Sequence, residues 1–180
     1  WHTDMTFLKN PPLCSILRSK ICPSKGGDTM WSSMTAAYES LSVSMKNFLK
    51  NLTAEHDFCH GFKESIAEPG GRERLKDAIK NNPPVVHPVI RTHPITRRKA
   101  IFVNPLFTTK INELSKSESD ALLEFLYSYS ITPEFTCRFS WTPNSIAIWD
   151  NRCTLHKPIN DYFPEHRLLE RITVDGDEPF

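Results

Sequence analysis

The sequence predicts a mainly β protein with flanking helices, of the β-sandwich or jelly-roll type. Several short segments alternate apolar and polar residues, few segments have helical spacing, and the turns are rich in proline, of which the chain has 14. Many short strands joined by such turns are typical of sandwiches and jelly rolls. The length fits a single domain, residues 1–180.

The composition is that of an ordinary globular protein. Charged residues make up 24% and hydrophobic residues 39%, and the formal net charge is +1. So weak a charge predicts no partner among nucleic acids or membranes, and no apolar run approaches the roughly 20 residues that span a bilayer. Five cysteines without a CxxC pair indicate reduced thiols and a cytoplasmic location. Assembly into a homo-oligomer stays open.

In the first third of the chain we expect strands followed by helical segments. Residues 1–7 and 13–22 are each predicted to form a strand, and residues 23–28 form a turn rich in glycine. A short strand then begins at Thr29. Apolar spacing over residues 33–52 predicts a helix in two pieces.

Residues 53–84 form the least regular part of the sequence. They are polar, interrupted by glycine and proline, and contain several aromatic residues, with a short helix expected near residues 72–80. Such an insert is a candidate active-site lid, and a solvated loop is the alternative. His56 and His60 are interpreted here as loop or surface residues.

The second half of the chain returns to strands around one long helix. A capping box at residues 115–118 predicts a helix that continues to about Tyr129. Strict alternation of apolar and polar residues makes residues 135–141 a half-buried strand. The other strands are expected at residues 85–91, 99–103, 145–149 and 167–174.

Two residues near the start of the chain suggest a metal site. His2 and Asp4 are two positions apart, so a strand would place both side chains on one face. With His156 as a candidate third ligand, they would supply the two histidines and one carboxylate that bind iron in non-haem Fe(II) oxygenases. A lone HxD pattern is more often a surface strand pair, so the assignment needs support from the rest of the chain.

Two arginines near the end of the chain suggest anion binding. Arg167 and Arg171 would share one face of a strand, although a helix would align them as well. The β-branched residues 172–174, followed by a turn, favour the strand. Two guanidinium groups on one face suit the binding of two anionic groups beside a metal.

Several separate motifs, in order along the chain, resemble the family of 2-oxoglutarate-dependent taurine dioxygenases. They are residues 2–4 (HTD), 26–29 (GGDT), 87–94, 107–109 and 149–152 (WDNR), together with His156, Arg167 and Arg171. The resemblance covers nearly the whole chain. It implies a double-stranded β-helix, a jelly roll of cupin type.

The resemblance also implies roles for individual residues. It places Fe(II) on His2, Asp4 and His156, and it assigns the far carboxylate of 2-oxoglutarate to Arg167 and Thr29. Residues 150–152 are interpreted not as catalytic but as shaping the turn before His156 and orienting that ligand.

For the substrate, the resemblance implies a small anionic molecule whose sulfonate is held by Arg171. Phe107, with Phe62 or Phe58, is expected to line the substrate pocket, and packing in the core is the alternative for these aromatic residues.

The activity that follows is hydroxylation of taurine or a related sulfonate next to sulfur. With Fe(II), 2-oxoglutarate and O2, it would release sulfite, an aldehyde, succinate and CO2. The same chemistry on an alkyl sulfate ester or an aryloxy-acid is one alternative. A non-enzymatic metal-binding jelly-roll protein is another, but it would have no use for Arg167 and Thr29.

A metal ligand at position 2 is unusual, because chain ends fray. We therefore expect a catalytic domain that lacks an N-terminal segment, and members of the family carry an upstream segment that contributes to the sheet and the substrate pocket.

Overall fold

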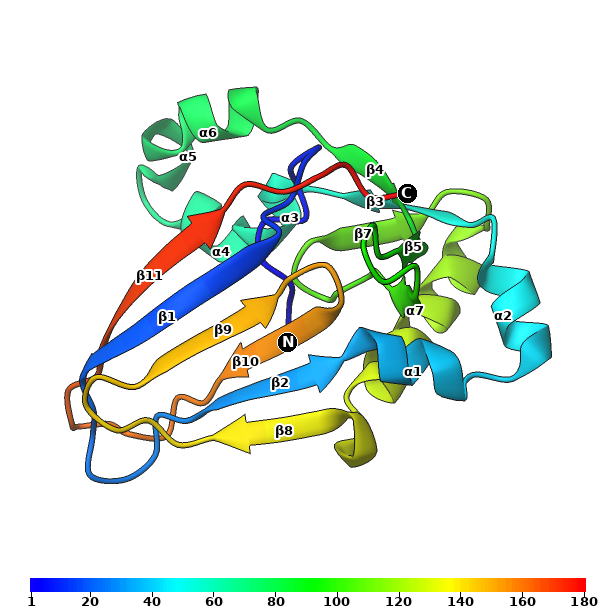
Figure 1. The fold of residues 1–180 in the computed structure, drawn as a ribbon. Helices are drawn as coiled ribbons and strands as arrows, with labels where there is room; N and C mark the ends of the chain where they lie inside the picture. Colours follow the sequence, from blue (N-terminus) through cyan, green and yellow to red (C-terminus); the bar gives the residue numbers. More distant parts are fainter.

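A computed structural model describes all 180 residues and shows a mainly β chain with helices around it (Figure 1). The strands are β1 (Cys14–Ile21), β2 (Thr29–Ser33), β3 (Thr53–His56), β4 (Val85–Pro88), β5 (Ile90–Thr92), β6 (Lys99–Ile101), β7 (Thr108–Ile111), β8 (Thr136–Phe139), β9 (Ile146–Asp150), β10 (Thr154–Pro158) and β11 (Leu168–Val174). The helices are α1 (Met34–Ser40), α2 (Val43–Leu49), α3 (Phe58–Gly61), α4 (Lys63–Ala67), α5 (Gly71–Arg74), α6 (Lys76–Asn81), α7 (Lys116–Ser130) and the 3-10 helix η1 (Pro133–Phe135). No helix is both long enough and apolar enough to cross a membrane.

Two antiparallel three-stranded sheets, β11-β1-β9 and β10-β2-β8, form the larger part of the fold. The chain passes from one sheet to the other between β9 and β10, which lie beside each other in Figure 1. Trp149 of β9 packs its ring 5.5 Å from that of Trp31 in β2 and 5.0 Å from that of His156 in β10. The inner faces of the two sheets therefore meet around these aromatic rings.

The main hydrophobic core lies on the other side of β10. It includes Met34 of α1 and Leu126 of α7, together with Leu155 of β10. Successive side chains of a strand point to opposite faces, so Leu155 faces the core while His156 faces the space between the sheets. Burial of Leu155, which is 2% exposed, thus fixes the direction of its neighbour.

Several predicted elements are confirmed. Helix α7 begins with the expected capping box, in which Ser115 and Glu118 each bond to the other's backbone N–H. The helical segment after β2 is in two pieces, α1 and α2. The strands expected around residues 13–22 and 167–174 are β1 and β11, which pair with each other.

The prediction of a strand at residues 1–7 was wrong. Only His2 forms a bridge, to His156, and the chain then turns, with Met5 at a positive φ of 51°. The strand expected at residues 85–91 is also divided in two. Strand β4 pairs with β3, whereas β5 pairs with β6, because the backbone changes sheets around Val89.

The interpretation of residues 53–84 needs two corrections. The segment begins with strand β3, the centre of the β4-β3-β7 sheet, and it contains four short helices instead of one. His56 is 0% exposed and its Nδ1 lies 2.9 Å from Thr6 Oγ1, so it is a core residue and not a surface one. Burial lowers the pKa of His56 to about 3, and the residue is neutral.

Candidate active site

The N-terminal segment is attached to β10 by a pair of backbone hydrogen bonds. The His2 N–H donates to His156 O at 3.0 Å, and the His156 N–H donates to His2 O at 2.8 Å. The Thr3 hydroxyl donates to Thr154 O. These bonds place the two histidine rings side by side, with centroids 4.2 Å apart, and bring Asp4 to the same face.

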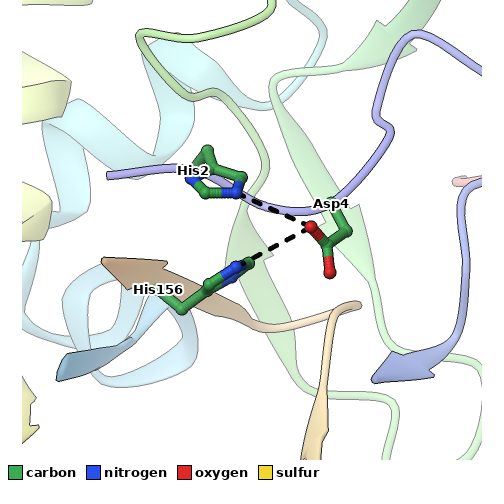
Figure 2. Close-up of side chains that lie close together, drawn as sticks. All are labelled: His2, Asp4 and His156. Atoms are coloured by element: carbon green, nitrogen blue, oxygen red, sulfur yellow. Dashed lines mark ion pairs between the residues drawn. The ribbon is translucent and has the colours of Figure 1, made fainter. Parts of the chain in front are cut away.

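The three predicted ligands converge on one oxygen. Asp4 Oδ1 lies 3.6 Å from His2 Nε2 and 3.7 Å from His156 Nε2, and Figure 2 shows both rings directed at that atom. One donor atom from each residue lies within 4.8 Å of the other two. Bonds of about 2.1 Å from each atom to a common ion require separations of this order.

The electrostatics of the cluster suit a divalent cation. Burial, with His2 acting in the same direction, lowers the pKa of His156 to about 3, so its imidazole is neutral and can coordinate. Burial alone would raise the pKa of Asp4, but contact with His2, the hydrogen bond from Ser15 and the charge of Arg171 hold it well below its usual range. Two imidazoles and one carboxylate are a donor set that fits Fe(II).

Two hydrogen-bond donors beyond the metal triad also hold Asp4. Arg171 Nη1 donates to Oδ1 at 3.1 Å, and the buried Ser15 hydroxyl donates to Oδ2 at 2.7 Å. Asn151 in turn donates to Ser15 Oγ. Asn151 is therefore linked to the carboxylate ligand, whereas the turn it belongs to had been expected to orient His156.

The predicted cosubstrate residues lie together at one end of the inter-sheet space. Arg167 donates through Nε to Gly27 O at 2.8 Å, and its Nη2 lies 3.4 Å from Thr29 Oγ1. Gly27 has a φ of 70°, and a Cβ there would lie 2.9 Å from Arg167 Cδ, so only glycine allows this approach. The Trp141 indole N–H also donates to Thr29 Oγ1, a contact that no motif in the sequence indicated.

Two cavities adjoin the triad, and Arg171 lines both. The first, about 310 Å³, contains Thr29 and Arg167 together with His2 and His156. The second, about 430 Å³, is lined by His2, Asp4, Met5, Phe7, Phe58, Phe62, Asn82, Leu106, Phe107 and Arg171. Phe107 is 4% exposed and Phe62 37%, so the predicted pocket aromatics are brought together, one in the wall and one at the rim.

A second cluster of metal-ligating side chains, His93, Asp150 and Cys153, is a structural network. His93 Nδ1 accepts the backbone N–H groups of Ile95 and Thr96, so its Nε2 carries the proton and donates to Asp150 Oδ2. Both Asp150 oxygens also accept from Arg152. Neither His93 nor Asp150 therefore has a free ligand atom, and together they brace the turn between β9 and β10.

Replacing Cys153 with serine is expected to change turnover by no more than a few-fold. Burial and then the charge of Asp150 raise the pKa of the Cys153 thiol, which is therefore not a reactive thiolate. The measurement is the rate of succinate formation by the iron-loaded variant. A loss of several orders of magnitude with iron still bound would reveal a catalytic role for this thiol.

The cluster of two histidines and one carboxylate, held between the two sheets of a mainly β fold, has the ligand arrangement of a non-haem metal oxygenase. The model of the family described as "Taurine catabolism dioxygenase TauD, TfdA family" matches residues 1–173. The chain belongs to this family.

Two relatives and one solved structure illustrate the similarity. The chain is 38% identical to an alkylsulfatase from Acinetobacter baylyi, over 98% of this chain and 56% of the relative. It is 34% identical to an alpha-ketoglutarate-dependent sulfonate dioxygenase from Saccharomyces cerevisiae, over 99% of this chain and 42% of the relative. The crystal structure of a taurine dioxygenase from Burkholderia xenovorans aligns with a TM-score of 0.84 and 38% identity, over 99% of this chain and 59% of that one. The chain thus spans about half the length of the curated relatives it matches.

Proposed function

We propose that this chain carries the metal and cosubstrate sites of an Fe(II)- and 2-oxoglutarate-dependent dioxygenase that acts on a sulfonate or a sulfate ester. The convergence of His2, Asp4 and His156 on one point, with two arginines beside it, is the observation that carries the proposal. The fold we propose is the double-stranded β-helix, of which the two three-stranded sheets would be the two sides.

His2, Asp4 and His156 would hold Fe(II), which with O2 and 2-oxoglutarate supplies the oxidising chemistry. Arg167 would pair with the far carboxylate of 2-oxoglutarate. Thr29 Oγ1 already accepts from Trp141, whose indole N–H can only donate. The Thr29 hydroxyl proton therefore has no partner in the protein and is available for the same carboxylate.

Arg171 would bind the substrate anion, because it lies where the two cavities meet beside the triad. Four phenylalanines, Phe7, Phe58, Phe62 and Phe107, form most of the apolar wall beyond it. The only carboxylate in that wall is the metal ligand Asp4. A substrate with its anion on Arg171 and an apolar chain against the phenylalanines fits this cavity better than one that ends in an ammonium group.

Hydroxylation at the carbon next to sulfur would give an aldehyde and sulfite from a sulfonate such as taurine. With a sulfate ester, hydroxylation of the carbon that bears the ester oxygen would give an aldehyde and sulfate. The apolar wall and the similarity to an alkylsulfatase both favour the second candidate. In each case the cosubstrate leaves as succinate and CO2.

The segment from α3 to α6 would act as a lid over the substrate cavity. Helices α5 and α6 lie above the two main sheets in Figure 1. The segment contributes Phe58 and Phe62 to the cavity wall, together with Asn82, the residue after α6. Closure would exclude water from the oxidised substrate.

A substrate series tests the proposed function directly. Succinate formation with Fe(II) and 2-oxoglutarate is compared for taurine, hexanesulfonate and hexyl sulfate, and the released sulfite and sulfate are quantified. We expect both six-carbon substrates to exceed taurine in kcat/KM, because their chains bury apolar area that taurine lacks. Faster turnover of taurine would refute the apolar-tail assignment. Succinate formation that no sulfur compound stimulates would refute the assignment to sulfonates and sulfate esters, and iron binding without any succinate would leave only a metal-binding protein.

A further inference from the structure

The two oxygens of the Asp4 carboxylate have different surroundings. Oδ1 faces both histidine Nε2 atoms and Arg171, on the side where a metal would bind. Oδ2 faces the protein interior and accepts the Ser15 hydroxyl at 2.7 Å. Ser15 is 0% exposed, so no water competes for this contact.

The direction of each hydrogen bond follows from the chemistry of the groups. An ionised carboxylate can only accept, so the Ser15 proton must point at Asp4. Ser15 Oγ can then only accept from Asn151, which lies 3.0 Å away and must present its amide nitrogen. Asn151 is itself 1% exposed, and its backbone N–H is tied to Leu13 O. The chain Asn151 to Ser15 to Asp4 is therefore directional and closed to solvent.

We propose that Ser15 and Asn151 are positioning residues that restrict Asp4 to binding the metal through Oδ1 alone. The inference rests on the proposed function. A carboxylate can also chelate a metal through both oxygens, and that mode would consume a coordination position. With Oδ2 held by Ser15, the three protein ligands would occupy three coordination positions of the metal and leave three open. A cosubstrate that binds through two atoms and one further reactant require all three.

The test compares Ser15→Ala with the unmodified chain in two binding measurements that need no turnover. One is the Kd for Co(II), and the other is the anaerobic titration of 2-oxoglutarate into the Fe(II) protein, followed by the absorbance of the complex. Loss of a partner that orients a metal ligand costs about 10- to 100-fold in metal affinity or activity. We expect a rise of that order in the Kd for 2-oxoglutarate, because Oδ2 becomes free to compete for its position.

Ser19→Ala is the matched control. Ser19 is also on β1, on the same face and 0% exposed, but its hydroxyl donates to Thr142 O and Ser145 O, far along the strand from the triad. Both variants lose one buried hydroxyl, so both are expected to lower Tm by a similar amount. Only Ser15→Ala should weaken ligand binding.

Asn151→Ala provides a second test of the chain. Asn151 reaches Asp4 only through Ser15, so its loss should weaken 2-oxoglutarate binding by a smaller factor. The double variant should bind no more weakly than Ser15→Ala alone, which is the non-additivity expected of groups acting in series.

The outcomes separate this inference from the proposed function. If the unmodified chain binds Fe(II) and 2-oxoglutarate but Ser15→Ala matches it within about twofold, the positioning role is refuted and the function stands. Equal weakening by Ser15→Ala and Ser19→Ala would likewise reduce Ser15 to a packing residue. If the unmodified chain forms no Fe(II) complex, both proposals fail.

Discussion

Replacing Asp4 with alanine is expected to abolish Fe(II) binding and turnover. Asp4 is the only carboxylate at the point where His2 and His156 converge, so it provides both a ligand atom and the negative charge that offsets the ion. Two imidazoles alone would leave a divalent cation with two protein ligands at a site that also contains Arg171. The loss should far exceed the roughly 10- to 100-fold that removal of an orienting residue costs. It is measured by titration of Fe(II) without oxygen.

Two further variants separate the ligand role from folding. Asp4→Asn keeps the size of the side chain and an oxygen for the Ser15 hydroxyl, so it should fold normally and still bind iron poorly. Asp28→Ala removes another buried carboxylate, the partner of Arg138, and should retain iron. Iron affinity in Asp4→Ala close to that of the unmodified chain would rule out the triad as the metal site.

The elements that the sequence predicted well are those with a clear local signal. In β8 the alternation of side chains and in β11 the β-branched residues predicted the correct element, although most residues of both strands are exposed, and in α7 the capping box marked the correct start. The predictions that were wrong concern residues whose structure depends on distant parts of the chain. Residues 1–7 look extended, but only His2 finds a backbone partner. His56 looks like a loop residue among polar neighbours, and only pairing of β3 with β4 and β7 buries it.

Part of the site was predicted from local spacing and motifs, whereas other parts depend on contacts between residues far apart in the sequence. The spacing of His2 and Asp4 predicted that both lie on one face, which is correct although the strand assumed for it does not form, and His156 was identified through the family motifs. The contact of Ser15 with Asn151 joins residues 136 positions apart. It depends on the register of β1 against β9, which no local pattern specifies. Trp141 reaches Thr29 from 112 positions away, because β2 pairs with β8.

The second large effect concerns the two arginines, which are expected to serve different ligands. They are four residues apart, about 13 Å for an extended chain at 3.3 Å per residue. Arg167 contacts Gly27 and Thr29, whereas Arg171 contacts Asp4. Arg171 also lines the phenylalanine cavity, which Arg167 does not reach. Their environments therefore match a cosubstrate site and a substrate site.

Removing one charge-assisted contact from a buried partner costs about 2–5 kcal/mol, or roughly 30- to several-thousand-fold in affinity. Arg167→Ala should raise the Kd for 2-oxoglutarate by such a factor and affect every substrate alike. Arg171→Ala should raise the KM for the sulfonate or sulfate ester, toward the lower end of the range because its side chain is 49% exposed. It should leave 2-oxoglutarate affinity nearly unchanged, as measured by the absorbance of the anaerobic Fe(II) complex.

Lysine at either position distinguishes a lost charge from a lost geometry. An ammonium keeps the charge but not the planar pair of N–H donors, so Arg167→Lys and Arg171→Lys should each recover only part of the affinity. Because Arg171 also donates to Asp4 Oδ1, iron affinity must be measured in the same variants, and it should not fall in Arg171→Ala. If each alanine variant weakened both ligands to the same extent, the two arginines would form one shared anion site. The assignment of a separate sulfonate or sulfate site to Arg171 would then be lost, and with it the physical reason for placing the substrate carbon beside the metal.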